Sequence, residues 1–182
     1  MKLKKIKINN QFFELYFKNG VFIPTATSDF LVNDFLKLNK KIKNKKILDL
    51  GCGSGIVSII LASKIKNNIF YASDLSNHAI QCCKKNFLNF RINGEVKRGN
   101  MLKPWLDYKF DFIINDVSGI SSSIAKKSSW FKNVPASTGS DGTKLTISVI
   151  KDSSKLLNKN GSLYLPLISL SNEQKIINTA KK

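Results

Sequence analysis

The sequence contains few of the residues that build metal sites, disulfide frameworks or membrane spans. It has three cysteines, Cys52, Cys82 and Cys83, and one histidine, His78. The odd cysteine count, without the spacing of metal ligands, predicts neither a disulfide framework nor a bound metal. No run approaches the roughly 18 to 20 apolar residues of a membrane span. The basic start leads into no apolar segment of a secretory signal, so we expect a cytoplasmic protein with no membrane partner.

Arginine is also scarce, although the chain is strongly basic. Its 28 lysines and 2 arginines oppose 12 acidic residues and give a net charge of +18. Proteins that recognise specific nucleic-acid sequences usually rely on the planar fork of arginine. An excess of lysine, together with many asparagines and isoleucines, is also typical of a bias toward A/T-rich codons. The charge therefore leaves two interpretations open, an anionic partner such as RNA or DNA, or a compositional bias.

The order of apolar patterns predicts the fold class. Short apolar runs alternate with helical patterns, which is typical of an α/β domain with a parallel sheet. Five strands are expected, at 46–50, 68–73, 94–97, 110–114 and 161–167, and helices are expected at 56–65, after Ser76 and at 142–157.

The 182 residues fit one main domain with a short preface. We place the main domain at residues 40–182. Residues 1–39 form the N-terminal preface, with a hairpin-like segment over 12–23 and a helix over about 28–38. Residues 119–140 have weak periodicity and are rich in serine and lysine, which predicts a long loop on the substrate side.

A glycine cluster follows the first predicted strand. Asp49 stands two residues before Gly51, and Gly53 and Gly55 follow at offsets of two and four. Glycines at such a turn let a ligand approach the backbone closely. A dinucleotide fingerprint needs its third glycine five positions after the first, so the spacing disfavours a nicotinamide-dependent oxidoreductase. The acid also suits a cationic ligand better than a pyrophosphate, and a turn without a ligand is the remaining alternative.

An acid also closes the second predicted strand. Asp74 stands nineteen residues after Gly55. In doubly wound sheets a carboxylate at this tip can hold both ribose hydroxyls of an adenosine, although such an acid can also be a helix cap. Together with the glycine cluster, Asp74 indicates an adenosine-containing ligand.

The order of Asp49–Gly55, Asp74 and Gly99–Leu102 resembles that of class I S-adenosylmethionine-dependent methyltransferases. The resemblance implies a Rossmann-like, doubly wound, mostly parallel sheet with S-adenosylmethionine as cofactor. It also implies that the glycine cluster holds the amino-acid half of the cofactor, that Asp74 binds the ribose and that Leu75 and Asn100 contact the adenine. The residues implied to bind the cofactor are Asp49, Gly51, Cys52, Gly53, Gly55, Asp74, Leu75, Asn100, Met101 and Asn115.

The same resemblance bears on the end of the domain. Members of this class usually finish with a helix followed by an antiparallel strand pair. The sequence ends at Lys182, within an expected helix that starts near Asn172. We therefore expect a C-terminally shortened domain that lacks this strand pair, with about five strands in the sheet and an uncovered edge prone to pair with another chain.

The tip of the fourth predicted strand is similar to the Asn-Pro-Pro-Tyr/Phe motif of methyltransferases that act on planar amide or amine nitrogens. Asn115 is kept, whereas Asp116 and Val117 replace both prolines and Ser118 replaces the aromatic residue. The resemblance implies that Asn115, Asp116 and Ser118 are catalytic, and that Asn115 helps to align the attacking nitrogen. Asp116 could accept a proton or pair with a cationic substrate, or it could be a solvated loop acid.

Two further segments, Gly20–Ser28 and Gly139–Gly142, resemble segments of the release-factor glutamine methyltransferases. The leading hypothesis is therefore N-methylation of a protein side chain such as a glutamine amide, with a translation factor as a possible partner. Methylation of an RNA or DNA base amine is the second hypothesis. The third is a non-catalytic relative that binds cofactor or nucleic acid and has a degenerate active-site motif.

Overall fold

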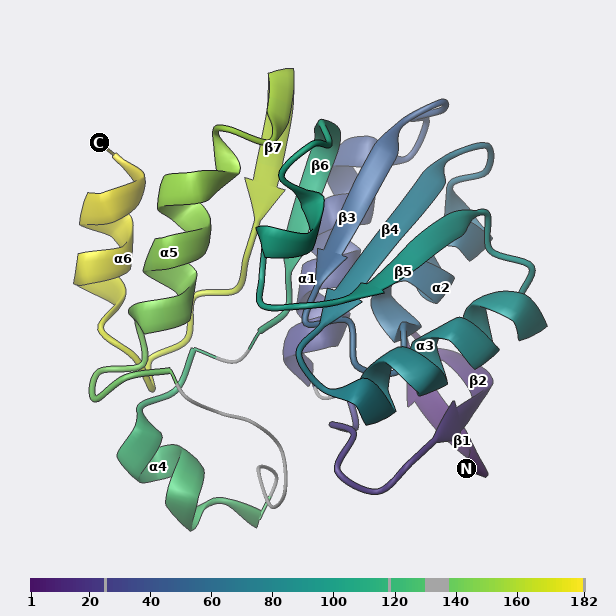
Figure 1. Cartoon of the computed structure of the whole chain (residues 1–182), viewed down its shortest axis with the longest axis horizontal. Helices are drawn as coiled ribbons and strands as arrows, with labels where there is room; N and C mark the ends of the chain where they lie inside the picture. Colours follow the sequence, from purple (N-terminus) through teal and green to yellow (C-terminus); the bar gives the residue numbers. More distant parts are fainter. Residues whose placement is uncertain (25, 118, 130–137, 182) are drawn as a thin grey trace.

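The computed structural model describes residues 1–24, 26–117, 119–129 and 138–181, and a parallel sheet organises these residues (Figure 1). Its strands are β3 (Lys46–Leu50), β4 (Ile69–Asp74), β5 (Gly94–Arg98), β6 (Phe110–Asn115) and β7 (Leu157–Tyr164). They lie in the order β5-β4-β3-β6-β7, and all neighbours are parallel. The Rossmann-like α/β fold expected from the sequence is therefore confirmed, with five strands in this sheet.

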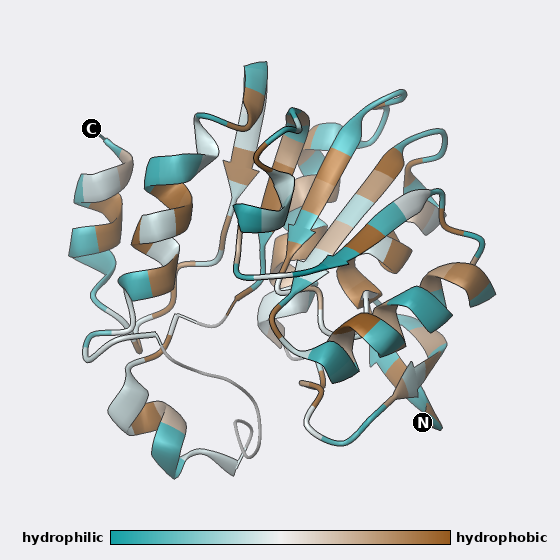
Figure 2. Ribbon diagram, in the orientation of Figure 1, coloured by the Kyte–Doolittle hydropathy of each residue, from teal (hydrophilic) through white to brown (hydrophobic). Residues whose placement is uncertain are grey.

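Helices cover both faces of the sheet. The first group is α1 (Ala26–Asn39), α2 (Ile56–Lys64) and α3 (Asn77–Asn89), and the second is the 3-10 turn η1 (Lys103–Trp105), α5 (Lys144–Ser153) and α6 (Glu173–Ala180), with α6 packed beside α5. Alternate residues of β3 divide between the two cores, with Ile47 facing the first group and Leu48 facing the second. Figure 2 shows the resulting apolar bands along the central strands.

An antiparallel hairpin precedes the sheet, formed by β1 (Lys2–Ile8) and β2 (Gln11–Phe17). The bounds of 12–23 expected from the sequence are therefore wrong. Asn9 and Asn10 both adopt positive φ angles, of 50° and 54°, and make the tight turn between the strands. The Asn-Asn pair is thus the turn signal that sequence analysis missed.

The hairpin packs on α3 and shares its core with α1 and α2. The side chain of Asn86 in α3 exchanges two hydrogen bonds with the backbone of Tyr16, at 2.8 and 3.1 Å. β2 buries Phe13, Leu15 and Phe17 on its inner face. The preface is therefore tied firmly to the sheet domain, while its division from that domain at residue 39 stays a prediction.

Two further bounds differ from those expected. β7 begins at Leu157, before the expected 161, because its first part is the polar run 158–160, which hides the strand from an apolar pattern. The helix expected over 142–157 is confined to α5, and residues 154–156 form a turn. In the described part of the chain β7 pairs with β6 alone, and no helix there is long and apolar enough to cross a membrane.

Candidate active site

A cavity of about 560 Å³ opens at the carboxyl ends of β3, β4 and β6. This is where the order of the parallel strands reverses, which is the usual ligand position in open α/β sheets, and the volume is within the range of small-molecule sites. The predicted site residues on its wall are Gly51, Gly53, Asp74, Leu75, Asn100, Met101 and Asp116. Within the described residues, no group of three or more His, Cys, Asp or Glu side chains could hold a metal ion.

The glycine loop is fixed by hydrogen bonds to the next strand. The amides of Gly51 and Cys52 both donate to the carbonyl of Ser73, at 2.8 and 3.0 Å. Gly53 has a φ of +54°, and a Cβ built there meets only the carbonyl oxygen of Phe22, at 3.9 Å. The loop therefore presents bare backbone to the cavity, as a closely approaching ligand requires.

Asp74 joins this loop to the start of α3. One carboxylate oxygen accepts a hydrogen bond from the amide of Gly53 (3.0 Å), and the other accepts one from the amide of Ser76 (2.8 Å). Burial raises the pKa of Asp74, and the backbone hydrogen bonds oppose this rise. Its position on the cavity wall suits an acceptor for ribose hydroxyls.

Asp49 lies below the loop, away from the cavity wall. It is 1% exposed, and one of its oxygens accepts hydrogen bonds from the hydroxyl (2.8 Å) and amide (3.3 Å) of Ser58. The other oxygen is buried and has no hydrogen-bond partner among the described residues. Burial raises the pKa of Asp49 to about 7, and the nearby charges of Asp116 and Asp74 add to the effect. A cationic group close by would relieve this carboxylate.

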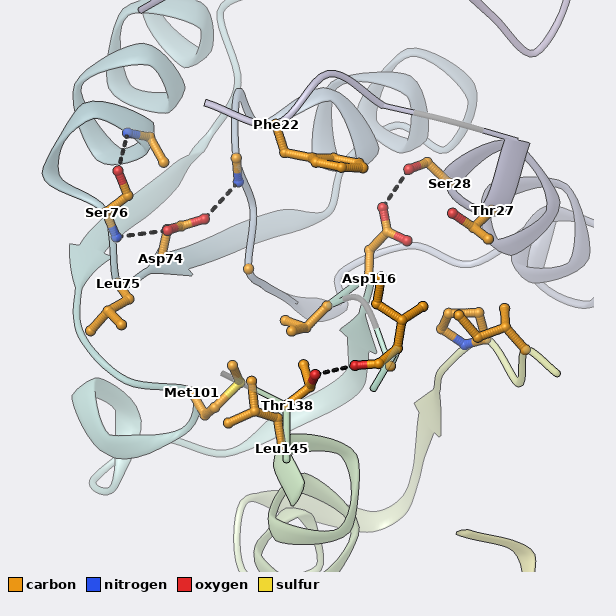
Figure 3. A pocket seen from close by; sticks show the side chains of 18 of the residues that line it. Phe22, Thr27, Ser28, Asp74, Leu75, Ser76, Met101, Asp116, Thr138 and Leu145 are labelled. Carbon is orange, nitrogen blue, oxygen red and sulfur yellow. Dashed lines mark hydrogen bonds between the residues drawn. The ribbon is translucent and has the colours of Figure 1, made fainter. Parts of the chain in front are cut away.

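Asp116 extends from the end of β6 into the cavity on the side opposite Asp74, with Phe22 directed toward the space between them (Figure 3). The hydroxyl of Ser28, the third residue of α1, donates a hydrogen bond to the Asp116 carboxylate at 2.5 Å. Burial raises the pKa of Asp116 to about 6, and the hydrogen bond from Ser28 opposes this rise. Asp116 is therefore a buried, hydrogen-bonded acid inside the cavity. This argues against the alternative that the sequence left open, a solvated acid in a loop.

Asn115 is 1% exposed and does not line the cavity. The oxygen of its side-chain amide, Oδ1, has no hydrogen-bond partner among the described residues. Val117 lines the cavity and packs so closely on Gly51 that a side chain there would collide with it. Ser118 lies outside the described residues, so its predicted role has no structural counterpart here.

Besides Asp49 and Asn115, two more of the residues predicted to bind cofactor do not line the cavity. Gly55 has a φ of +84°, and an added Cβ would lie 2.8 Å from the sulfur of Cys83 and 3.1 Å from the ring of Phe87. The glycine therefore allows α2 to approach α3 closely. The side chain of Cys52, within the loop, is buried beside Cys83. The hydrogen bond with Cys83 and burial hold the pKa of the Cys52 thiol well above the usual range.

Sequence analysis missed the contribution of Ser28 and of the segment after β7. Pro166, Ile168 and Leu170 from this segment, with Leu145 of α5, form an apolar wall beyond Asp116. Ser28 stands 88 residues from Asp116, so only the likeness of the segment 20–28 to a known motif pointed toward the site.

The chain is similar to methyltransferases in sequence. A family model for the methyltransferase small domain matches residues 14–116. The release factor glutamine methyltransferase of Flavobacterium psychrophilum is 35% identical over 112 residues, which are 58% of this chain and 39% of the relative. That of Clostridium botulinum is 28% identical over 176 residues, 90% of this chain and 62% of the relative. The chain thus spans less than two thirds of the length of these relatives.

Solved structures share the fold. The T. thermophilus 16S rRNA N2 G1207 methyltransferase, in complex with AdoMet and guanosine, has a TM-score of 0.75 at 12% identity, over 97% of this chain and 44% of that one. A methyltransferase from Pyrococcus furiosus has a TM-score of 0.61 at 17% identity, over 92% and 74%. Because the family match covers more than half of the chain, from β2 to the acid that follows β6, the chain belongs to the methyltransferase small domain family, within the class I S-adenosylmethionine-dependent methyltransferases.

Proposed function

We propose that the protein is an S-adenosylmethionine-dependent N-methyltransferase that acts on a planar amide or amine nitrogen, with a glutamine side chain of another protein, such as a translation factor, as its substrate. The observation that carries the proposal is a cavity whose wall contains two acids: Asp74, placed to accept hydrogen bonds from the ribose hydroxyls of an adenosine, and Asp116 on the opposite side (Figure 3). The names of the release factor relatives support the glutamine substrate.

The residues present fit S-adenosylmethionine. Asp74 would hold the ribose, while Leu75, Asn100 and Met101 would enclose the adenine. The bare backbone of Gly51 and Gly53 leaves room for the amino-acid half. The buried oxygen of Asp49 that has no partner in the described part of the chain lies on the same side, and its carboxylate favours the positively charged groups of this cofactor.

The reacting side of the cavity would work mainly by positioning. When bound, the cofactor supplies a methyl group whose bond to sulfur breaks as its bond to the substrate nitrogen forms. Asp116 would accept a hydrogen bond from an N–H group of the substrate and so align the nitrogen, while Asn115, which is buried and does not line the cavity, stays a predicted acceptor for the second N–H group. Asp116 would then take the proton that the nitrogen releases, while Ser28 holds its carboxylate in place. Ser118 stays a predicted contact with the substrate.

An exocyclic amine of an RNA or DNA base is the second candidate substrate. It presents the same planar NH2 group to the same acceptors, and the net charge of +18 favours an anionic substrate. The third candidate is a non-catalytic protein. It would bind the cofactor in the half of the cavity around Asp74 but would not transfer the methyl group in the half around Asp116.

The test has two stages. Calorimetric titration with S-adenosylhomocysteine is expected to show micromolar binding. Transfer of a labelled methyl group from S-adenosylmethionine is then measured with purified release factors and with RNA, and the modified residue is located by mass spectrometry. Methylglutamine in the protein supports the leading proposal, and a methylated base supports the second. Binding without transfer to either would indicate the non-catalytic relative, and no binding by folded protein would overturn the enzyme.

A further inference from the structure

The outer face of the β1–β2 hairpin exposes an aromatic ring among lysines. The strand register places Leu3, Lys5 and Lys7 opposite Tyr16, Glu14 and Phe12 on this face, while the other face of β2 is buried. Phe12 is 62% exposed and Leu3 is 52% exposed. An exposed phenylalanine at a sheet face has no role in the core, so its surroundings indicate what it can bind.

The ring of Phe12 is flanked by positive charge. The ammonium groups of Lys5 and Lys7 lie 4.7 and 6.0 Å from its centroid, and Lys85 of α3 lies 5.3 Å from the centroid of Tyr16. Within the described residues, none of these lysines forms an ion pair, although Glu14 stands directly opposite Lys5. The face therefore carries unneutralised charge beside an open aromatic surface.

The turn of the hairpin contacts the helix α1, which also lines the cavity. The amide of Asn9, in the hairpin turn, donates a hydrogen bond to the Asp29 carboxylate at 2.8 Å. Asp29 is followed by Phe30, a second aromatic residue that is 69% exposed, and preceded by Ser28, which lines the cavity. The hairpin turn and the cavity are thus both in contact with the first turn of α1.

We propose that the hairpin face, defined by Lys5, Lys7, Phe12 and Tyr16 with Lys85, binds single-stranded nucleic acid. Phosphates would pair with the lysines, and an unpaired base would stack on Phe12. A compositional bias explains a surplus of lysine on all surfaces, but it does not explain an exposed phenylalanine and a partly exposed tyrosine among those lysines. The combination of cations and open rings is the one that single strands require, since every base offers a flat face and every linkage a negative charge.

The binding test does not depend on methyl transfer. A fluorescein-labelled oligouridylate of about 12 nucleotides is titrated at several salt concentrations and its anisotropy is recorded. For the parent protein we expect binding that weakens as salt rises. The double variant Lys5→Ala/Lys7→Ala should reduce the slope of log K against log salt by about 1.4, because single strands lose about 0.7 for each phosphate contact.

Matched variants separate a local site from general charge. Lys64→Ala/Lys66→Ala removes two exposed lysines near the end of α2 and should leave the slope unchanged. Phe12→Leu removes the ring, keeps an apolar side chain and should weaken binding about tenfold, whereas Phe12→Tyr should restore it. Thermal melts of all variants should match the parent, because each changed side chain is exposed.

Three results would overturn the proposal. One is an equal loss of slope in the two lysine pairs, which would mean attraction by net charge alone. Another is binding that does not change in Phe12→Leu. The last is equal or tighter binding of poly-glutamate or of anionic lipid vesicles with the same dependence on Phe12, which would assign the face to an acidic protein or a membrane surface. Failure of methyl transfer would bear only on the proposed function and would leave this result intact.

Discussion

The two halves of the cavity are built in different ways. Around Asp74 the wall is backbone at the ends of adjacent strands, and the acid bonds amides only 2 and 21 residues away. Around Asp116 the wall is made of side chains from distant segments, and the hydroxyl that bonds the acid, that of Ser28, stands 88 residues earlier. The first half is thus a property of two neighbouring βα units. The second depends on how α1, α5 and the segment after β7 pack together, so substrate preference can change while the cofactor half stays fixed.

The sharpest way to separate the halves is Asp116→Asn. The variant keeps the size of the side chain and removes the proposed proton acceptor, so kcat should fall by about a hundredfold or more. Affinity for S-adenosylhomocysteine, measured by calorimetry, should stay within about threefold of the parent. A variant that transfers methyl groups at the parent rate would show that Asp116 is not the acceptor.

Asp49→Asn probes the buried charge below the glycine loop. The folded-state pKa of Asp49 is raised from 3.8 to about 7, so the native state binds a proton that the unfolded state gives up. Its contribution is present below about pH 4 and is lost as the pH rises to 7. Asparagine should therefore leave stability unchanged at pH 4 and increase the free energy of unfolding by about 2 to 4 kcal/mol at pH 8. Urea unfolding at the two pH values measures this, and a difference that does not depend on pH would contradict it.

Asp74→Ala tests whether the backbone half is a cofactor site. The substitution removes the ribose acceptor and two charged hydrogen bonds, one to the glycine loop and one to the start of α3, so affinity for S-adenosylhomocysteine should fall about thirtyfold to a hundredfold, or roughly 2 to 3 kcal/mol. Asp107→Ala, at an exposed position outside the cavity, is the matched control and should bind like the parent. Similar affinities for the two variants would remove Asp74 from the proposed site.

Ser28→Ala should have the smallest effect, because it removes one hydrogen bond and keeps the acid. Burial raises the pKa of Asp116, and this bond lowers it, for a net value of about 6. Without it the carboxylate ionises at higher pH, so the midpoint of the kcat profile should move upward by about half a unit to one unit. Rates at pH 8.5 should equal those of the parent, whereas rates near pH 6 should be lower. In the Asp116→Asn background the substitution should not move the profile, and a shift there would point to another titrating group.

The same contrast explains what could be predicted from sequence. Asp74 and the glycine loop were found because strand, turn and acid follow one another at short range and a pattern records them. The hairpin was misplaced because its turn is Asn9–Asn10, without a glycine, and β7 was placed late because it begins with polar residues. The contact between Ser28 and Asp116 has no sequence pattern, since it arises only when α1 packs against the sheet. The family resemblance implies that Gly55 binds the cofactor, yet its neighbours are Cys83 and Phe87 of α3.

The alternation of β3 has a consequence for how this protein can evolve. Ile47 and Asp49 point to the α2 side of the strand, whereas Leu48 and Leu50 point to the α5 side. A shift of one residue in the register of β3 would therefore carry the carboxylate to the wrong face of the sheet. It would also disrupt the packing of both cores at once. The packing of the apolar residues next to Asp49 in β3, Leu48 and Leu50, thus fixes the side of the strand on which the acid lies. Selection for folding alone keeps the side chain of residue 49 on the α2 side of the strand, but it does not keep an aspartate there, because ionisation of the buried carboxyl costs stability as the pH rises to 7 and above.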